Sequence, residues 1–375
     1  MKVLVAVNEF KGSLSSLEIG EIISNKLNSN YDNITALVQP IADGGDGFLA
    51  LFKGFEKMKF KTINAARQEC EVNYLLDIKR KEAVIEIAEV IGLKHLKDIQ
   101  KDPYKTSTVG LGRLISFLLK KGINHFIIGL GGSATNDCGI GMLSELGVQF
   151  TDKNGNICKH GIDDLMKINQ IDLRFIDEKF KNAKFTIISD VNNPLTGKNG
   201  SAHIFGPQKG ATPEMVEVLD KNLLHYSEVV KKDLKIEIND VPGAGAAGGL
   251  GAGLLTLGAI LMKGVEIVID TVDLEKKLKD ADLVITGEGG MDRQTIFGKT
   301  PFGVAQVAKK YNIPVIGIAG NLGSGYEILY DNGFDAIFSI MPGVRTLEVA
   351  LASGSVNVEN TVRNIFRALK SIKLK

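Results

Sequence analysis

Short apolar runs alternate with helical patterns along most of the chain, and this alternation limits the folds it can adopt. Apolar runs bounded by turn residues, as in buried strands, occupy residues 3–7, 34–38, 126–128, 185–188, 283–285, 315–318 and 336–339. Between them, Ser15 and Glu18 form a capping box, and Thr212 and Thr300 each precede a proline that can begin a helix. Alternating strands and helices predict an α/β fold with a mostly parallel sheet.

One region interrupts this alternation. Residues 59–64, 72–76 and 83–87 are strand-like runs with no helical pattern between them, which predicts antiparallel pairing. The alternation resumes near Thr108, and a chain of 375 residues is long enough for two domains. We therefore expect a discontinuous α/β domain of residues 1–60 and 282–375, with a second α/β domain, residues 61–281, inserted into it.

Charge and cysteine content limit the binding partners and the cellular location that we expect for the protein. Lys and Arg number 45 against 44 Asp and Glu, so no overall field favours nucleic acid or an anionic membrane, and we expect neither as a partner. The three cysteines form no C-x-x-C pair, and the first apolar run is too short for a signal peptide, which predicts a cytoplasmic protein. Glycines punctuate the apolar run of residues 243–262, so we do not expect it to span a membrane.

Loops rich in Gly, Asp and Asn follow most of the predicted strands. Because ligands bind at the carboxyl ends of strands in α/β sheets, these loops are the candidate site. Lys11, Lys209 and Lys299 lie beside glycines there, a pattern that suits phosphate neutralisation.

The stretch 241–253, VPGAGAAGGLGAG, matches the dinucleotide pattern G-x-G-x-x-G between Gly243 and Gly248. The helix that this pattern requires follows, with Leu250, Leu254, Leu257 and Leu261 on one face, but no strand precedes it. Three interpretations stay open: a nicotinamide site, close packing of a helix, or backbone N–H groups that face an anion. A second near match at residues 129–134 follows a strand and continues into a polar segment, residues 135–137, that we expect to begin a helix.

Five acids follow predicted strands, namely Asp43, Asp46, Asp190, Glu288 and Asp292. Each alone suits a turn or a helix cap. Together they could hold Mg²⁺, which binds one or two carboxylates plus substrate phosphates, or accept a hydroxyl proton in phosphoryl transfer. No Ser-His-Asp set is recognisable, which disfavours a hydrolase.

The loops taken together resemble the glycerate kinase family of the two-domain bacterial type. The matching segments are residues 10–16, 42–47, 129–137, 190–195, 205–211, 242–250, 287–295 and 298–301. The resemblance implies ATP-dependent, Mg²⁺-dependent phosphorylation of D-glycerate, with 2-phosphoglycerate the favoured product, in glyoxylate, glycerate or sugar-acid catabolism. It also implies two α/β domains, one flavodoxin-like, with the active site in the cleft between them.

Two departures from the family pattern are visible. The family usually has Asp-Ser where this chain has Asn8-Glu9, and Arg-Leu where it has Gly290-Met291. We expect the kinase activity to survive both changes.

On the resemblance we assign roles to individual residues. The predicted catalytic residues are Asp190, Lys11 and Asp43, and the predicted metal ligands are Asp190, Glu288 and Asp292. The predicted substrate and phosphate contacts are Ser13, Gly131, Gly132, Ser133, Thr135, Asn136, Asn193, Lys209, Gly243, Gly245, Gly248, Gly249, Gln294 and Lys299. A homodimer is a further possibility. The alternatives are a kinase for another small hydroxyacid or polyol, a nicotinamide-dependent dehydrogenase, and a non-catalytic sensor of a sugar acid or nucleotide.

Overall fold

The computed structural model describes the chain except Asp43, Asp46, Asp177 and residues 98–100, 159–161, 265–273 and 372–375. The chain forms two compact units, an outer unit of Met1–Lys53 and Lys263–Lys375 and an inserted unit of Gly54–Met262. These limits differ from the predicted ones near residues 60 and 282. The inserted unit's first strand, β3 (Glu56–Ile63), pairs with its neighbour along its whole length, so residue 60 lies inside that strand.

The outer unit is built on a five-stranded parallel sheet in the order β13-β12-β11-β1-β2. Its strands are β1 (Lys2–Val7), β2 (Thr35–Val38), β11 (Leu283–Met291), β12 (Val315–Leu322) and β13 (Ala336–Ser339). Each predicted strand of this unit is confirmed. The order is that of the flavodoxin-like fold, in which the chain crosses from one side of β1 to the other after β2.

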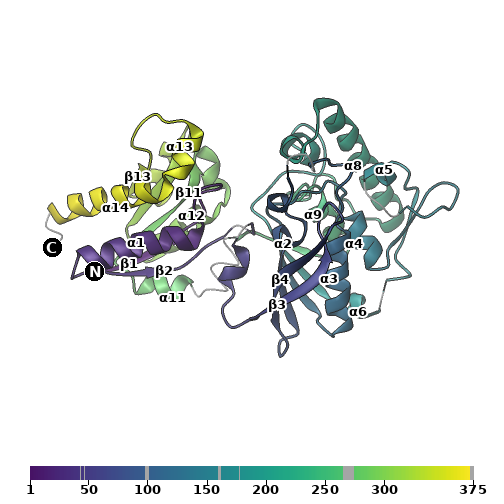
Figure 1. Ribbon diagram of the computed structural model, residues 1–375, viewed down its shortest axis with the longest axis horizontal. Coiled ribbons are helices and arrows are strands. Elements are labelled where there is room, and N and C mark those ends of the chain that lie inside the picture. Colours follow the sequence, from purple (N-terminus) through teal and green to yellow (C-terminus); the bar gives the residue numbers. More distant parts are fainter. Residues whose placement is uncertain are drawn as a thin grey trace. The chain divides into compact units, whose positions relative to one another are not determined.

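The helices of the outer unit are α1 (Ser16–Asn30), α11 (Leu274–Lys279), α12 (Thr300–Lys310), α13 (Leu347–Ala352) and α14 (Gly354–Ser371). The predicted capping box of α1 is confirmed, because Ser15 and Glu18 bond to each other's backbone N–H. Helices α1 and α14 lie side by side (Figure 1), with Ile23 of α1 and Val362 of α14 in one core. Thr300 is the first residue of α12, and Lys299 is its N-cap, one residue earlier than predicted.

The inserted unit has a six-stranded sheet in the order β10-β9-β6-β5-β4-β3. Its strands after β3 are β4 (Glu69–Asp77), β5 (Glu82–Glu86), β6 (His125–Gly129), β9 (Lys184–Ile188) and β10 (Ile260–Met262). The predicted antiparallel pairing is confirmed for β3 with β4 and for β4 with β5, and the other pairs are parallel. The short pair β7 (Gln149–Thr151) and β8 (Gln170–Asp172) was not predicted.

The helices of the inserted unit are α2 (Ile87–Ile91), α3 (Val109–Lys120), α4 (Ile140–Glu145), α5 (Ile162–Leu165), α6 (Glu178–Lys181), α7 (Ser201–Phe205), α8 (Pro213–Leu234) and α9 (Leu250–Leu255). Two expectations were wrong. The segment 135–137 is irregular and α4 begins only at Ile140, because Cys138 and Gly139 have positive φ angles of 52° and 77°. Helix α9 ends at Leu255, and Leu261 lies in β10, which pairs with β9 instead of extending the helix.

Candidate active site

In the outer unit, the loop after β1 packs against the carboxyl-terminal part of β11, at the point where the strand order reverses. In flavodoxin-like sheets this is where ligands bind. The Asn8 N–H donates to the Gly287 oxygen at 2.8 Å. A Cβ placed on Gly289 would lie 3.4 Å from the Phe10 Cα. The carboxyl-terminal part of β11 therefore lies directly against the loop that carries Lys11.

That loop is a tight turn held by its own backbone. The Phe10 N–H donates to the Leu14 oxygen at 2.8 Å, and the Ser13 hydroxyl donates to the Leu351 oxygen at 2.6 Å. Ser13 therefore anchors the loop to α13, whereas the Lys11 side chain is exposed. Asp43, the other catalytic residue predicted in this unit, lies outside the described residues.

Glu288 and Lys299 form an ion pair near the carboxyl end of β11. Their side chains are 3.1 Å apart, and the Glu288 side chain is only 13% exposed. The Thr295 hydroxyl also donates to Glu288, at 3.2 Å. A cation and a hydroxyl thus hold the Glu288 carboxylate in position.

Asp292 caps a helical turn in this structure. Its carboxylate accepts the Gln294 N–H at 2.7 Å, and Thr295 completes a capping box at the start of the 3₁₀ turn Arg293–Phe297. The Gln294 side chain is exposed.

The two departures from the family pattern have different surroundings. Met291 is fully buried, so the change at that position lies in the core. A Cβ on Gly290 would meet nothing within 4 Å. Asn8 is buried, and its side-chain oxygen accepts the Glu9 N–H at 2.9 Å.

In the inserted unit, Lys209 is bonded to the loop after β6. Its ammonium donates to the Thr135 carbonyl oxygen at 2.7 Å and to the Ser133 hydroxyl at 3.1 Å. Only 2% of Lys209 is exposed, and this burial lowers its pKa to about 7, against the opposing effect of the Asp137 charge. The structure thus brings together Ser133, Thr135 and Lys209, three predicted ligand contacts.

Asp137, which we did not single out as a site residue, is the acid that fixes this loop. It is fully buried and accepts the Thr108 N–H and hydroxyl, both at 2.9 Å, and the Gly139 N–H at 3.1 Å. Desolvation raises the pKa of Asp137, and these hydrogen bonds oppose the rise. Asp137 thus joins the starts of α3 and α4 to the loop after β6.

The buried ammonium predicts a pH-dependent stability. Unfolded Lys209 keeps its proton up to pH 10.5, whereas folded Lys209 loses it near pH 7. Between these values the unfolded chain binds more protons, so the free energy of unfolding should rise with pH. Denaturant titrations at several pH values across this window should show that Lys209→Met flattens the rise. Lys299→Met, which removes an ammonium that is 32% exposed, should leave it in place. An unchanged slope in Lys209→Met would contradict the assignment.

The glycine-rich turn of residues 243–249 packs between the loops that follow β6 and β9. A Cβ on Gly245 would lie 2.2 Å from the Pro194 oxygen, and one on Gly248 would lie 1.8 Å from the Thr135 oxygen. The Gly245 N–H donates to the Asn193 oxygen at 3.1 Å, so that group does not face an anion. No strand precedes the turn and α9 has only six residues, so the dinucleotide fingerprint lacks its framework. Close packing therefore accounts for Gly245 and Gly248, and the proposal that other N–H groups of this turn face an anion stays a prediction.

The loop after β9 carries Asp190, which is half-buried, two residues past the end of that strand. The Asn193 side chain donates to the Asn199 oxygen at 2.7 Å and shapes the loop. A Cβ on Gly243 would lie 3.1 Å from the Val191 oxygen, so the glycine turn also supports the backbone next to Asp190.

Three buried side-chain atoms near Lys209 have no hydrogen-bond partner within the described chain. They are the Thr135 hydroxyl and both amide atoms of Asn136, and both residues are fully buried. Unpaired buried polar atoms cost roughly 1–3 kcal/mol each. They therefore fit the predicted role of Thr135 and Asn136 as ligand contacts. Gly131 and Gly132 precede them in the same loop, where Gly132 has a φ of 69° and its oxygen accepts the Leu93 N–H.

The described side chains offer few groupings that could bind a metal ion. Within the part of the chain that the structure describes, no group of three or more His, Cys, Asp or Glu side chains could hold a metal ion. Mg²⁺ bound with phosphates needs only one or two carboxylates, and the half-buried Asp190 and the fixed Glu288 are oxygen donors of that type.

The fold and the loops define an α/β enzyme whose candidate ligand groups lie at the carboxyl ends of parallel strands. The profile of the glycerate kinase family matches residues 3–370. The Escherichia coli K12 glycerate 2-kinase is 41% identical over 98% of both chains, and the Bacillus subtilis 168 glycerate kinase is 42% identical over 100% of this chain and 99% of its own. A crystal structure described as that of a glycerate kinase 2 from Salmonella typhimurium LT2 matches with a TM-score of 0.81 and 42% identity, over 100% of both chains.

This chain belongs to the glycerate kinase family. It is thus an enzyme, a kinase that phosphorylates glycerate, and ATP is its phosphate donor. Among the helices of the described residues, none is both long enough and apolar enough to cross a membrane.

Proposed function

We propose that this kinase phosphorylates the 2-hydroxyl of D-glycerate and requires Mg²⁺, and that loops at the carboxyl ends of the strands in each unit supply ligand contacts. The 41% identity to a glycerate 2-kinase over 98% of both chains is the observation that supports the position of phosphorylation. The homodimer and the cytoplasmic location also remain proposals.

In the proposed mechanism, Asp190 accepts the proton of the glycerate hydroxyl as the phosphoryl group is transferred. An aspartate in this role needs access to substrate, and Asp190 is half-buried on an irregular loop after β9. The exposed ammonium of Lys11 neutralises phosphate oxygens. Positioning and charge neutralisation supply most of the rate enhancement in phosphoryl transfer, which suits loops fixed by buried contacts such as those of Lys209 and Asp137.

Glu288 of the outer unit is a proposed Mg²⁺ ligand, and metal ligation is the alternative proposed role of Asp190 in the inserted unit. When bound, the ion would neutralise charge on the phosphates of the donor. Contacts with Lys299 and Thr295 hold the Glu288 carboxylate in position. The capping role of Asp292 makes it the weakest of the three predicted ligands.

Phosphorus NMR of the reaction of ATP, Mg²⁺ and D-glycerate tests the proposal. We expect a new phosphomonoester signal with the proton coupling of a secondary phosphate, which identifies 2-phosphoglycerate. The coupling of a primary phosphate would show phosphorylation at the 3-position instead. Absence of turnover, with D-glycerate still raising the melting temperature, would favour a sensor or another acceptor, and omission of Mg²⁺ tests the metal requirement.

A further inference from the structure

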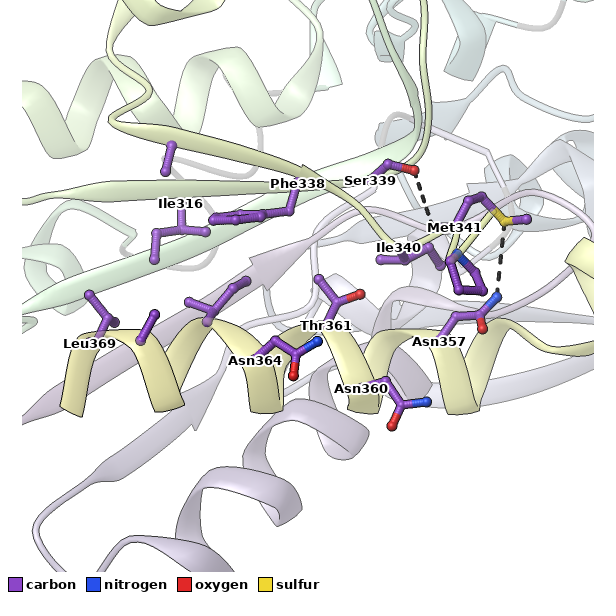
Figure 2. A pocket seen from close by; sticks show the side chains of 14 residues that line it. Ile316, Phe338, Ser339, Ile340, Met341, Asn357, Asn360, Thr361, Asn364 and Leu369 are labelled. Atoms are coloured by element: carbon purple, nitrogen blue, oxygen red, sulfur yellow. Dashed lines mark hydrogen bonds between the residues drawn. The ribbon is translucent and has the colours of Figure 1, made fainter. Parts of the chain in front are cut away.

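A pocket of about 400 Å³ lies in the outer unit between helix α14 and strands β12 and β13 (Figure 2). This size lies within the range of small-molecule sites. None of the sequence motifs discussed above falls in it. It is lined by Ile316, Ala336, Phe338, Ser339, Ile340, Met341, Pro342, Asn357, Asn360, Thr361, Asn364, Ile365, Ala368 and Leu369. We call it the α14 pocket.

The lining of the α14 pocket is uncharged throughout, yet it is not simply apolar. One wall presents Phe338, which is 39% exposed, with Ile316 beside it. The other wall is α14, where Asn357, Asn360 and Asn364 follow one another at spacings of three and four residues. Such residues lie on the same side of a helix, so the three carboxamides form a row.

The carboxamides of the row form only some of the hydrogen bonds that they could form. The Asn357 amide approaches the Met341 sulfur at 4.0 Å, a weak contact (Figure 2). The Asn360 oxygen accepts from Arg363 at 2.7 Å, which leaves its amide N–H groups. Asn364 is exposed and forms no hydrogen bond with the rest of the described chain. Carboxamides offer a donor and an acceptor side by side, which is the arrangement that pairs with the edge of adenine.

We propose that the α14 pocket binds the adenine base of the donor nucleotide. The lining disfavours glycerate and the triphosphate as occupants, because none of its residues carries a positive charge that could balance an anion. A flat neutral heterocycle suits it, because its face can stack on Phe338 while its polar edge meets the carboxamides. This assignment rests on the use of ATP by the kinase and locates the base within the outer unit.

One end of the pocket lies near the part of α14 that packs against the loop carrying Lys11. Helix α14 begins at Gly354, where a Cβ would lie 2.2 Å from the Ser13 hydroxyl oxygen. Asn357, at one end of the pocket, is one helical turn further along. At the same end, Ser339 closes β13 at the carboxyl edge of the sheet. A base in the pocket thus places the phosphates toward Lys11, at the edge where flavodoxin-like sheets bind ligands.

Two variants and a control test the assignment. Ala368→Trp fills the pocket, and Asn364→Ala removes the unpaired carboxamide. The control is Arg367→Ala, which truncates an exposed side chain of α14 that does not line the pocket. Calorimetric titration of each protein with ATP and with inorganic tripolyphosphate separates recognition of the base from recognition of the phosphates.

We expect the ATP dissociation constant to rise at least tenfold in Ala368→Trp and about three- to tenfold in Asn364→Ala, the loss of one or two neutral hydrogen bonds. Tripolyphosphate binding, the KM for glycerate and the melting temperature should not change, and Arg367→Ala should match the wild type. Unchanged ATP binding in both variants would overturn the proposal. The proposal would also be overturned if Ala368→Trp lost self-association while its ATP affinity stayed unchanged. The occupant of the pocket would then be a second copy of the chain. Base-dependent binding without turnover of glycerate by the wild type would instead count against the proposed function alone.

Discussion

Replacement of Asp190 by Asn should lower kcat by about a hundredfold to a thousandfold and leave the fold intact. The substitution keeps the size of the side chain but removes both its charge and its ability to take a proton. A positioned general base contributes roughly 10²–10⁴-fold to a rate. Asp190 is half-buried on the loop after β9, and thermal denaturation of the variant would check that the fold is intact. Steady-state kinetics at saturating ATP and D-glycerate would measure the effect.

The accompanying control is Asp240→Asn, which changes an exposed acid in a later loop of the same unit. Its kcat should equal that of the wild type. A loss below about tenfold in Asp190→Asn, roughly 1.4 kcal/mol of transition-state stabilisation, would rule out a central role for Asp190. The dependence on Mg²⁺ then separates two functions. A base changes the pH profile of kcat, whereas a metal ligand raises the Mg²⁺ concentration needed for half-maximal rate.

Local patterns predicted most of the fold because most of its elements are specified locally. Apolar runs marked β1, β6 and β9, and the Ser15–Glu18 capping box marked α1, because these signals depend on neighbours in the sequence. The predictions were wrong where contacts between residues distant in the sequence determine the secondary structure. Residues 260–262 continue the leucine spacing of α9, but they pair with β9 instead, a partner more than 70 residues away in the sequence.

The candidate site was predictable in its loops and not in its internal contacts. The glycines and acids at strand ends identified the loops, since ligands in α/β sheets bind there. The sequence could not show that Lys209 binds the oxygen of Thr135, 74 residues earlier, or that Asp137 holds Thr108. The carboxamides of the α14 pocket have no local signature either. One side of α14 is apolar, so asparagines on its other side look in the sequence like ordinary solvent-facing residues.

The glycine turn gives the second large effect, in stability rather than rate. Gly248 has a φ of 73°, and an added Cβ would lie 1.8 Å from the Thr135 oxygen, which also accepts the Lys209 ammonium. Alanine there combines two costs. The left-handed backbone costs roughly 1–2 kcal/mol, and the overlap forces the turn away from the loop after β6. That shift would strain the bond from the Cys138 N–H to the Gly248 oxygen, now 3.1 Å. We expect Gly248→Ala to destabilise the inserted unit by more than about 3 kcal/mol.

Gly258→Ala separates these two costs. Gly258 has a φ of 80°, close to that of Gly248, but a Cβ there would meet nothing within 4 Å. Its replacement should therefore carry only the backbone penalty, about 1–2 kcal/mol. Thermal and urea denaturation of both variants, followed by circular dichroism, would measure the difference. If the Gly248→Ala protein were insoluble and the Gly258→Ala protein soluble, this would also support a larger destabilisation by Gly248→Ala. Equal destabilisation of the two would mean that the turn yields easily, and that its close approach to Thr135 does not fix the loop on which Lys209 depends.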